Sequence, residues 1–322
     1  MKQKIVVLDT GYPSYEREKK LFEEQGWDFK VFEGARDAVK QKIRLAREAT
    51  GIMVRWTRID EAFLEQLPQL KAVVRYGTGY DNIDLEAASA HHIKVANVSG
   101  YANHSVSDHA LAMIYANARA LFPGNNNLLA SFGMAPVPRV FELQTKTLGI
   151  IGLGRIGSTL AKKANPLFKH VLAYDPYIPK EQFDEAGATQ TELEKLLFKS
   201  DVISIHCNLT EETNNMINKE TFYQMKHQPI LVNTARGDIV NGGDLLNALN
   251  SKQIHSAGID VFNEEPPSEL QADLLAHPRI ITTGHYAWYS ERSIKILQET
   301  AAQHMIKLLN GVIPDDCLNP DA

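Results

Sequence analysis

The segment that decides the fold is 146-KTLGIIGLGRIGSTLAKKANPLFKHVLAYD-175. An apolar run, Thr147–Ile151, has the length of a buried strand and leads into the glycine-rich turn GLGRIG at residues 152–157. An amphipathic stretch with apolar residues at helical spacing follows, and a second apolar run, His170–Tyr174, ends at Asp175. The order of strand, turn, helix, strand and acid is typical of a unit that binds a dinucleotide.

Each glycine of the turn has a chemical reason. Gly152 permits the tight turn, Gly154 lets the backbone approach a pyrophosphate, and Gly157 lets the helix pack close to the sheet. The start of the helix offers free N–H groups and the positive end of its dipole to the phosphates. Asp175 can accept hydrogen bonds from a ribose 2′-hydroxyl and repel a 2′-phosphate, so the sequence predicts NAD rather than NADP.

The bulk composition narrows the class of protein. A chain of 322 residues exceeds one ordinary core and predicts two domains. The formal charge of −5 gives no general attraction to nucleic acid or to anionic membranes. No apolar run reaches the roughly 18 residues of a membrane span, and we expect the N-terminus not to be a signal peptide, because its apolar run has only the length of a strand. The only cysteines, Cys207 and Cys317, cannot form a disulfide framework, so we expect a cytoplasmic protein. The histidines lack ligand spacing joined to a cysteine or acid cluster, so we expect no metal site.

Apolar runs and helical segments alternate along the chain, which predicts an α/β fold with parallel sheets. The predicted strands are residues 4–9, 29–32, 51–54, 71–76, 95–98, 147–151, 170–174, 201–206, 230–233, 255–261 and 280–283. The predicted helices include residues 35–50, 109–121 and 290–310, and residues 125–141 are predicted as a polar loop or arm. We expect one domain at 1–100 and 291–322, to which the last helix returns, and a dinucleotide-binding domain at 101–290.

Reactive side chains follow several predicted strands, where open parallel sheets bind ligands. Arg236 follows one strand, Glu265 another and His285 a third, and two glycines follow Arg75. A guanidinium can bind a carboxylate through two hydrogen bonds and polarise an adjacent carbonyl. A histidine that titrates near neutrality can deliver a proton while a hydride reaches carbon, and a nearby carboxylate favours its charged form.

These motifs together resemble the D-isomer-specific 2-hydroxyacid dehydrogenase family. The glycine turn with its acid, NTARG, DVFNEEP and HPRIITTGH carry the resemblance. RYGTGYDNID, HCNLTEET and HYAWYSERS resemble the branch that contains C-terminal-binding proteins and phosphoglycerate-dehydrogenase-like enzymes. The resemblance runs from about Arg75 to Pro314 and is weaker before it. It implies a flavodoxin-like substrate domain and a Rossmann NAD-binding domain, with a cleft between them that closes on the substrate.

The resemblance also implies roles for individual residues. Arg236 would clamp the carboxylate and carbonyl of the substrate, His285 would be the general acid/base, and Glu265 its partner. Substrate contacts would come from Arg75, Tyr76, Gly77 and Trp288, although Arg75 could instead form an ion pair and Trp288 could pack on the last helix. The implied cofactor contacts are Val106, Gly152, Gly154, Arg155, Ile156, Gly157, Asp175, His206, Cys207, Asn208, Thr213, Thr234, Ala235 and Asp260. Cys207 is expected to line the cofactor site as a small residue rather than act as a nucleophile.

The sequence departs from the family pattern at one position, and the function stays partly open. The family commonly has proline before the catalytic histidine, whereas this chain has Gly284, so we expect His285 to depend more on Glu265 and its surroundings. The leading hypothesis is an NAD-dependent enzyme that interconverts a 2-keto acid and a D-2-hydroxy acid, as a homodimer.

Two other functions stay open at this stage. One is an NAD(H)-sensing corepressor-like scaffold, which we expect to need longer terminal segments than a chain that ends twelve residues after Asn310. The other is oxidation of 3-phosphoglycerate, for which Arg55 and Arg58 are candidate phosphate ligands.

Overall fold

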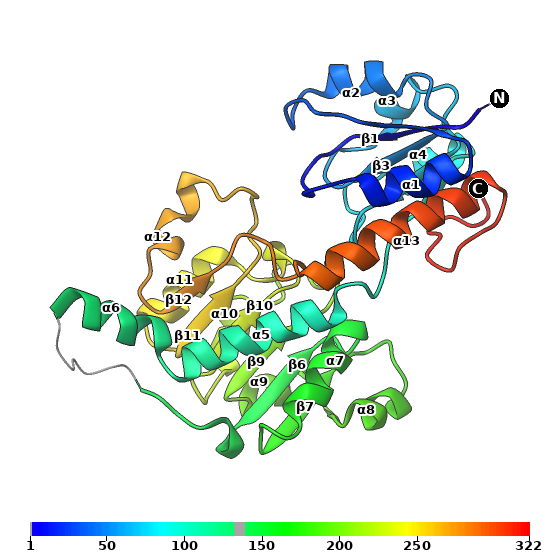
Figure 1. Cartoon of the computed structure of the whole chain (residues 1–322). Helices are drawn as coiled ribbons and strands as arrows, with labels where there is room; N and C mark the ends of the chain where they lie inside the picture. Colours follow the sequence, from blue (N-terminus) through cyan, green and yellow to red (C-terminus); the bar gives the residue numbers. More distant parts are fainter. Residues whose placement is uncertain (1, 132–138) are drawn as a thin grey trace. The chain divides into compact units, whose positions relative to one another are not determined.

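The chain folds into two compact units, each built on one parallel sheet (Figure 1). The computed structural model describes residues 2–131 and 139–322. Unit 1 comprises Met1–Tyr101 and Ser290–Ala322, and unit 2 comprises Ala102–Tyr289. The predicted α/β class with two parallel, Rossmann-like sheets is confirmed.

Unit 1 has the strand order β2-β1-β3-β4-β5. Its strands are β1 (Lys4–Val7), β2 (Asp28–Val31), β3 (Gly51–Val54), β4 (Ala72–Arg75) and β5 (Lys94–Ala96). Its helices are α1 (Glu16–Glu24), α2 (Val39–Ala46), α3 (Glu61–Leu64), α4 (Leu85–Ala90) and α13 (Glu291–Leu309). The last helix, α13, packs against α1 and β4, and thereby joins the C-terminal segment to the N-terminal sheet (Figure 1).

Unit 2 has the strand order β12-β11-β10-β9-β6-β7-β8. Its strands are β6 (Thr147–Ile151), β7 (His170–Tyr174), β8 (Thr189–Gln190), β9 (Val202–Ile205), β10 (Ile230–Asn233), β11 (Ser256–Ile259) and β12 (Ile280–Thr282). Its α-helices are α5 (Asn103–Ala118), α6 (Leu121–Ser131), α7 (Arg155–Ala164), α8 (Lys180–Ala186), α9 (Leu193–Lys199), α10 (Lys219–Gln224), α11 (Gly242–Asn250) and α12 (Ala272–Leu275). The direction of strand order reverses between β6 and β9, which is where such sheets bind ligands.

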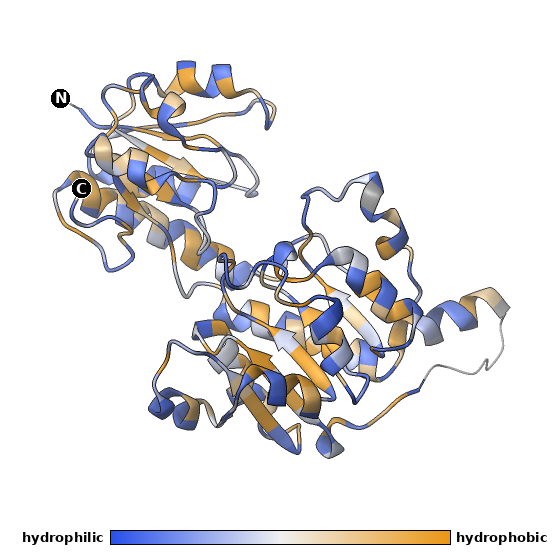
Figure 2. Ribbon diagram, turned by 180° about the vertical axis from the view of Figure 1, so that it is seen from behind, coloured by the Kyte–Doolittle hydropathy of each residue, from blue (hydrophilic) through white to orange (hydrophobic). Residues whose placement is uncertain are grey.

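The sheet of unit 2 is buried on both faces, as its apolar strands predict. Successive residues of β10 alternate between two cores: Ile230 and Val232 face the core under α5 and α7, and Leu231 faces the core under α9, α10 and α11. Hydrophobic residues are concentrated in these central strands, and polar residues in the turns (Figure 2). This packing fixes the positions of the strand ends, from which the polar loops extend.

Three predicted segments differ from the observed ones. The helix predicted at 35–50 is limited to α2, because residues after Ala46 turn into β3. The helix predicted at 109–121 begins at Asn103 and ends at Ala118. The prediction of a polar loop at 125–141 is wrong for residues 125–131, which belong to helix α6. Residues 132–138 of this range lie outside the described residues. Pro123 is compatible with α6 because it lies in the first turn, where no N–H partner is needed.

The core beneath α10 provides a test of this packing. Phe222 is fully buried and its neighbour Tyr223 is 71% exposed. Phe222→Ala should destabilise the protein by about 3–5 kcal/mol, because it leaves a cavity in the core. Tyr223→Ala on the same helix should cost less than about 1 kcal/mol. Denaturant unfolding of both variants would measure this, and equal losses would contradict the described orientation of α10.

Candidate active site

The glycine turn after β6 has the steric demands that its sequence predicts. Gly152 has φ +87°, and a Cβ there would lie 2.5 Å from the backbone nitrogen of Cys207 in the loop after β9. A Cβ at Gly157 would lie 2.1 Å from the carbonyl oxygen of Gly152. A Cβ at Gly154 would meet no atom within 4 Å, so the backbone there faces open space. Two of the glycines are therefore required by packing, and the third leaves room for a ligand.

Polar groups around this turn fit a dinucleotide. Helix α7 begins at Arg155 without a side-chain cap, so its first N–H groups are available to phosphate oxygens. Two buried atoms at neighbouring strand ends, His206 Nδ1 and Thr234 Oγ1, have no hydrogen-bond partner among the described residues. Buried polar atoms are nearly always paired, so these two atoms are suited to receive polar groups of a ligand.

Asp175 lies at the carboxyl end of β7, beside the glycine turn. Its Oδ2 accepts a hydrogen bond from the Leu153 N–H at 2.9 Å, and its Oδ1 accepts one from the Tyr177 N–H at 3.0 Å. A carboxylate has about four acceptor positions, so Asp175 can still accept from a ribose hydroxyl. The two backbone bonds fix the orientation of the carboxylate relative to the turn.

Burial keeps both His206 and Cys207 uncharged. It lowers the pKa of His206 to about 4, and it raises the pKa of Cys207 to about 11. The thiol of Cys207 is therefore protonated near neutrality, which argues against a nucleophilic role. The neutral imidazole of His206 shares a 2.8 Å hydrogen bond with the Ser204 hydroxyl through Nε2.

Glu265 and His285 form the central pair of the site, from the loops after β11 and β12. Their Oε2 and Nδ1 atoms are 2.5 Å apart, and Glu265 Oε1 accepts from the Phe262 N–H at 3.2 Å. Burial alone would raise the pKa of Glu265, but the hydrogen bond and charge of His285, assisted by the charge of Arg236, lower it below its ordinary value. Glu265 is therefore a carboxylate near neutrality, and Nε2 of His285 is the ring nitrogen left for chemistry.

The loop that carries Arg236 packs against the loop that carries Glu265, and the charge of Arg236 acts on Glu265. A Cβ on Gly237 would lie 2.1 Å from the carbonyl carbon of Phe262, so only glycine permits this approach. Asn233, the last residue of β10, holds the turn: its Nδ2 donates to the Arg236 carbonyl at 2.8 Å, and its Oδ1 accepts from the Ala235 N–H at 3.0 Å. The structure thus brings together the three residues predicted to carry the chemistry.

Comparison with known proteins identifies the family of this site. The sequence matches the family described as D-isomer specific 2-hydroxyacid dehydrogenase, NAD binding domain, over residues 111–287, more than half of the chain. The chain belongs to the D-isomer specific 2-hydroxyacid dehydrogenase family. It is 31% identical to glyoxylate/hydroxypyruvate reductase B of Serratia proteamaculans, over 98% of this chain and 97% of that protein.

Two further relatives extend the comparison. D-3-phosphoglycerate dehydrogenase of Archaeoglobus fulgidus is 33% identical over 87% of this chain, which spans only 53% of that protein. The crystal structure of D-lactate dehydrogenase from Aquifex aeolicus, complexed with NAD and lactic acid, has a TM-score of 0.83 and 26% identity, over 96% of each chain. The predictions of an NAD-dependent 2-hydroxyacid dehydrogenase and of NAD as its cofactor are confirmed.

In this 2-hydroxyacid dehydrogenase, the loop that carries His285 is anchored by Asp260, which is fully buried. The Asp260 carboxylate accepts from the N–H groups of Tyr286 and Ala287 at 3.1 and 3.0 Å and from the Thr283 hydroxyl. Its carbonyl also accepts from the His285 N–H at 2.7 Å. The sequence predicts Asp260 as a cofactor contact, and its observed partners are those of an anchor for the loop that carries His285.

The backbone at His285 is unusual, with φ +53° in the left-handed region. Such a conformation is costly for a residue with a side chain, and it persists only where surrounding contacts impose it. The Trp288 indole N–H donates to the His285 carbonyl at 2.9 Å, so this predicted substrate residue also holds the loop. A Cβ at Gly284 would meet no atom within 4 Å, so packing does not require glycine at this position. The contacts made by the neighbouring residues hold the loop.

The sequence did not indicate that His109 contributes to the site. His109 on α5 lies with its Nε2 3.0 Å from the Thr283 hydroxyl and 3.8 Å from Asp260 Oδ1. Its ring also makes an edge-to-face contact with Tyr286, with ring centroids 5.4 Å apart. No sequence signal singled it out, because it lies more than 150 residues from its partners in a helix that reads as apolar.

The predicted substrate residues of unit 1 have different environments. Arg75 is half-buried at the end of β4, and its Nη1 donates to the Tyr76 carbonyl at 2.7 Å. A Cβ on Gly77 would lie 1.8 Å from that same Nη1, so glycine makes room for the guanidinium. Tyr76 is buried, and its hydroxyl donates to Glu18 Oε1 at 2.9 Å. The Tyr76 side chain is therefore an interior group, and only its backbone is suited to meet a substrate.

The remaining predicted cofactor residues lie in unit 2 near the strand ends or on α5. Thr213 donates to the Asn208 carbonyl at 2.6 Å and so folds the loop after β9, whereas Val106 is buried on α5. Arg155 is exposed, and Ile156 and Ala235 are half-buried. Their cofactor contacts stay predictions.

Among the described residues, no helix has the length and apolar character to cross a membrane.

Asp175 provides a test of cofactor choice in this dehydrogenase. Asp175→Asn keeps an oxygen for the Leu153 N–H but removes the charge that opposes a 2′-phosphate. The ratio of kcat/KM for NADH over NADPH should therefore fall by about tenfold or more, since a charged hydrogen-bond partner is lost. Glu181→Gln, on the exposed face of α8, serves as a control and should leave the ratio unchanged. A wild-type enzyme that used NADPH as well as NADH would overturn the assignment.

Proposed function

We propose that this enzyme reduces a small 2-oxo acid to the D-2-hydroxy acid with NADH, in the cytoplasm and as a homodimer. The observation that carries the proposal is the 2.5 Å contact between Glu265 and His285, beside Arg236 and on an NAD-binding domain. The name of the Serratia relative supports glyoxylate and hydroxypyruvate as first substrates to test. The two free cysteines are compatible with a reducing compartment.

Different side chains bind the substrate and transfer the proton. Arg236 binds the substrate carboxylate through its guanidinium and polarises the adjacent carbonyl. NAD, when bound, supplies or accepts the hydride at the substrate carbon. His285 donates the Nε2 proton to the carbonyl oxygen during reduction and takes it back during oxidation. Glu265 holds Nδ1, and so sets the tautomer and orientation of the imidazole.

A phosphorylated substrate is the second candidate. The identity to D-3-phosphoglycerate dehydrogenase of Archaeoglobus fulgidus supports it, as do Arg55 and Arg75 at adjacent strand ends of unit 1. Oxidation of NADH measured with a panel of 2-oxo acids, including a phosphorylated one, separates the two candidates. If no acid in the panel supported NADH oxidation while NADH still bound, the proposed reaction would be wrong and a cofactor-sensing scaffold would be favoured.

The pair of Glu265 and His285 provides a test through pH. Reduction needs imidazolium, so its rate should fall as the pH rises, whereas oxidation needs neutral imidazole and should gain. Because the pKa of Glu265 is lowered below its ordinary value, the group is ionised throughout the neutral and alkaline range. Glu265→Gln keeps the shape but removes this charge, so the alkaline limb of reduction should move to lower pH.

The same experiment includes removal of the imidazole. His285→Ala should lower the rate by about 10²–10⁴ while NADH affinity is retained. Rates in both directions against pH, with NADH affinity measured separately, provide the comparison. Near-normal turnover in His285→Ala would refute the catalytic role, and an unmoved profile in Glu265→Gln would refute only the partner role.

The proposed homodimer is supported by helix α6. Four of its large apolar side chains are exposed: Leu121 by 57%, Phe122 by 53%, Leu128 by 55% and Leu129 by 68%. Figure 1 shows α6 extending from the body of unit 2, and such an exposed apolar face is typical of a protein–protein contact.

A double substitution on this face tests the proposed dimer. Leu128→Asp with Leu129→Asp should convert the dimer to a monomer, because it places charges in the apolar contact. Phe198→Asp, at a side chain on α9 that is 52% exposed, is the control and should leave the dimer intact. Sedimentation at micromolar concentration measures the difference, and a monomeric wild-type protein would contradict the proposal.

A further inference from the structure

A groove of about 780 Å³ lies in unit 1 between helix α2 and the first two strands of the sheet. Val6 of β1 and Lys30 of β2 are paired in register and line one wall, and α2 with the turn after it lines the other. All of the described residues that line this groove belong to unit 1. The groove is therefore separate from Arg236, Glu265 and His285, which belong to unit 2.

The groove is long enough for an extended chain. Its lining starts at Lys4 and Asp28, the first residues of β1 and β2, and reaches Phe32, which follows the last residue of β2. The span from Asp28 to Phe32 is about 13 Å, at about 3.3 Å for each residue of a strand. An extended alkyl chain of eight carbons is about 9 Å long, given C–C bonds of about 1.5 Å. Such a chain can therefore lie along the groove.

The floor of the groove is apolar. Val6, Phe32 and Ala49 are buried, and Leu45 on α2 is half-buried and packs against the core of unit 1. An alkyl chain on this floor loses its contact with water, and each buried methylene strengthens binding by about fourfold. The floor therefore favours a ligand with an apolar body.

Two acidic side chains line the groove within the described residues, and both are paired with lysines. Asp28 Oδ1 lies 2.7 Å from Lys2 Nζ, and Glu48 Oε2 lies 2.5 Å from Lys4 Nζ. The hydrogen bond from each lysine holds the pKa of its carboxyl partner below the usual range. Both acids are therefore ionised near neutrality, and the charge of each is balanced by its lysine.

Three cations that line the groove have no such partner. The side chains of Lys30, Arg44 and Arg47 are exposed, and they form no hydrogen bond or ion pair within the described part of the chain. They concentrate positive charge at this groove in a chain whose formal charge is −5. Because like charges repel, an anion bound among these three side chains is favoured. The charge of the rim is therefore complementary to an anionic head group.

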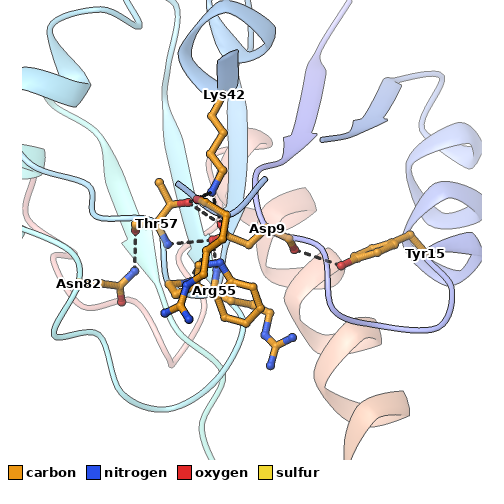
Figure 3. Close-up of polar contacts among 8 residues, drawn as sticks. Asp9, Tyr15, Lys42, Arg55, Thr57 and Asn82 are labelled. Atoms are coloured by element: carbon orange, nitrogen blue, oxygen red, sulfur yellow. Dashed lines mark hydrogen bonds and ion pairs between the residues drawn. The ribbon is translucent and has the colours of Figure 1, made fainter. Parts of the chain in front are cut away.

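Helix α2, the wall that carries Arg44 and Leu45, is fixed to the sheet by a buried ion pair. Lys42 Nζ lies 2.8 Å from Oδ1 of Asp9, which follows β1, and the two side chains are 1% and 0% exposed (Figure 3). Nζ also donates to the Arg36 carbonyl at 2.7 Å and to the Thr57 hydroxyl at 2.8 Å.

Asp9 is itself held by the loop that follows β3. Its Oδ2 accepts from the N–H groups of Arg55, Trp56 and Thr57 at 2.8, 3.1 and 3.0 Å. Burial would raise the pKa of Asp9, but the hydrogen bonds from Lys42 and Thr57 lower it below its ordinary value, so the group is a carboxylate. The position of α2 is thus fixed before any ligand binds, and a preformed groove loses little conformational entropy on binding.

We propose that this groove is a binding site for a medium-chain carboxylate, whose alkyl chain lies on the apolar floor and whose head group binds the unpaired cations of the rim. A carboxylate and a guanidinium form two parallel charge-assisted hydrogen bonds, which Arg44 and Arg47 can each provide. This ligand is not the substrate, and the site does not depend on the proposed reaction.

The experiment titrates the full-length protein with octanoate in a calorimeter. Octan-1-ol, which lacks the charge, and acetate, which lacks the chain, serve as control ligands. Octanoate should bind at least about tenfold more tightly than octan-1-ol, as expected for charged hydrogen bonds. Affinity should rise about fourfold with each methylene from butanoate to octanoate. Salt at about 1 M should weaken octanoate binding, because exposed charges are then screened beyond about 3 Å.

Substitutions at exposed positions locate the site. Arg44→Gln with Arg47→Gln should lower the affinity for octanoate by about tenfold or more, because two charged partners are lost. Lys40→Gln is the matched control, since Lys40 is an exposed cation of the same helix that does not line the groove. The control should bind octanoate like the wild type, and both variants should keep the wild-type affinity for NADH.

Four results would overturn the proposal. Octan-1-ol that bound as tightly as octanoate would show a purely apolar groove, and an equal loss in Lys40→Gln would show a general charge effect. Octanoate binding that survived in the double arginine variant would place the ligand elsewhere, including the active site. A changed oligomeric state in the double arginine variant, with octanoate binding unchanged, would show that the groove is a contact between copies of the chain.

Discussion

Parallel strand pairing is the constraint on which the rest of the structure depends. Because every strand of unit 2 runs in one direction, the loops after β6, β9, β10, β11 and β12 all emerge at one edge of the sheet. The reversal of strand order between β6 and β9 brings Gly152 against Cys207, an approach that no side chain at position 152 would allow. The residues predicted to bind the cofactor and those predicted to carry the chemistry are thereby presented by one sheet.

Both units use the same local device at their strand ends. In each, a buried aspartate follows one strand and accepts hydrogen bonds from successive backbone N–H groups of the loop after the adjacent strand. Asp9 after β1 holds the loop after β3, and Asp260 after β11 holds the loop after β12. A carboxylate can satisfy several N–H groups at once, so a single side chain fixes a loop that has no regular structure. At His285 this fixation is strong enough to maintain a left-handed backbone conformation.

The active-site pair shows how one contact combines electrostatics with orientation. Glu265 remains ionised although it is partly buried, because His285 and Arg236 supply positive charge. Its contact with Nδ1 leaves Nε2 of His285 as the ring nitrogen that we propose for proton transfer. The loop contacts of Asp260, His109 and Trp288 then decide where that atom points, which the identity of the ring does not determine.

The sequence by itself determined the α/β class, the dinucleotide unit and the family, because these depend on local periodicity and on motifs of fixed spacing. It also indicated Arg236, Glu265 and His285, since reactive residues after predicted parallel strands must lie at one edge. Only the tertiary structure decided which of them touch. The pairing of Asp9 with Lys42, the inward position of Tyr76 and the contact of His109 with Thr283 join residues 33, 58 and 174 positions from their partners. Such contacts follow from how helices pack on the sheet, and side-chain packing over these separations leaves no periodic signal in the sequence.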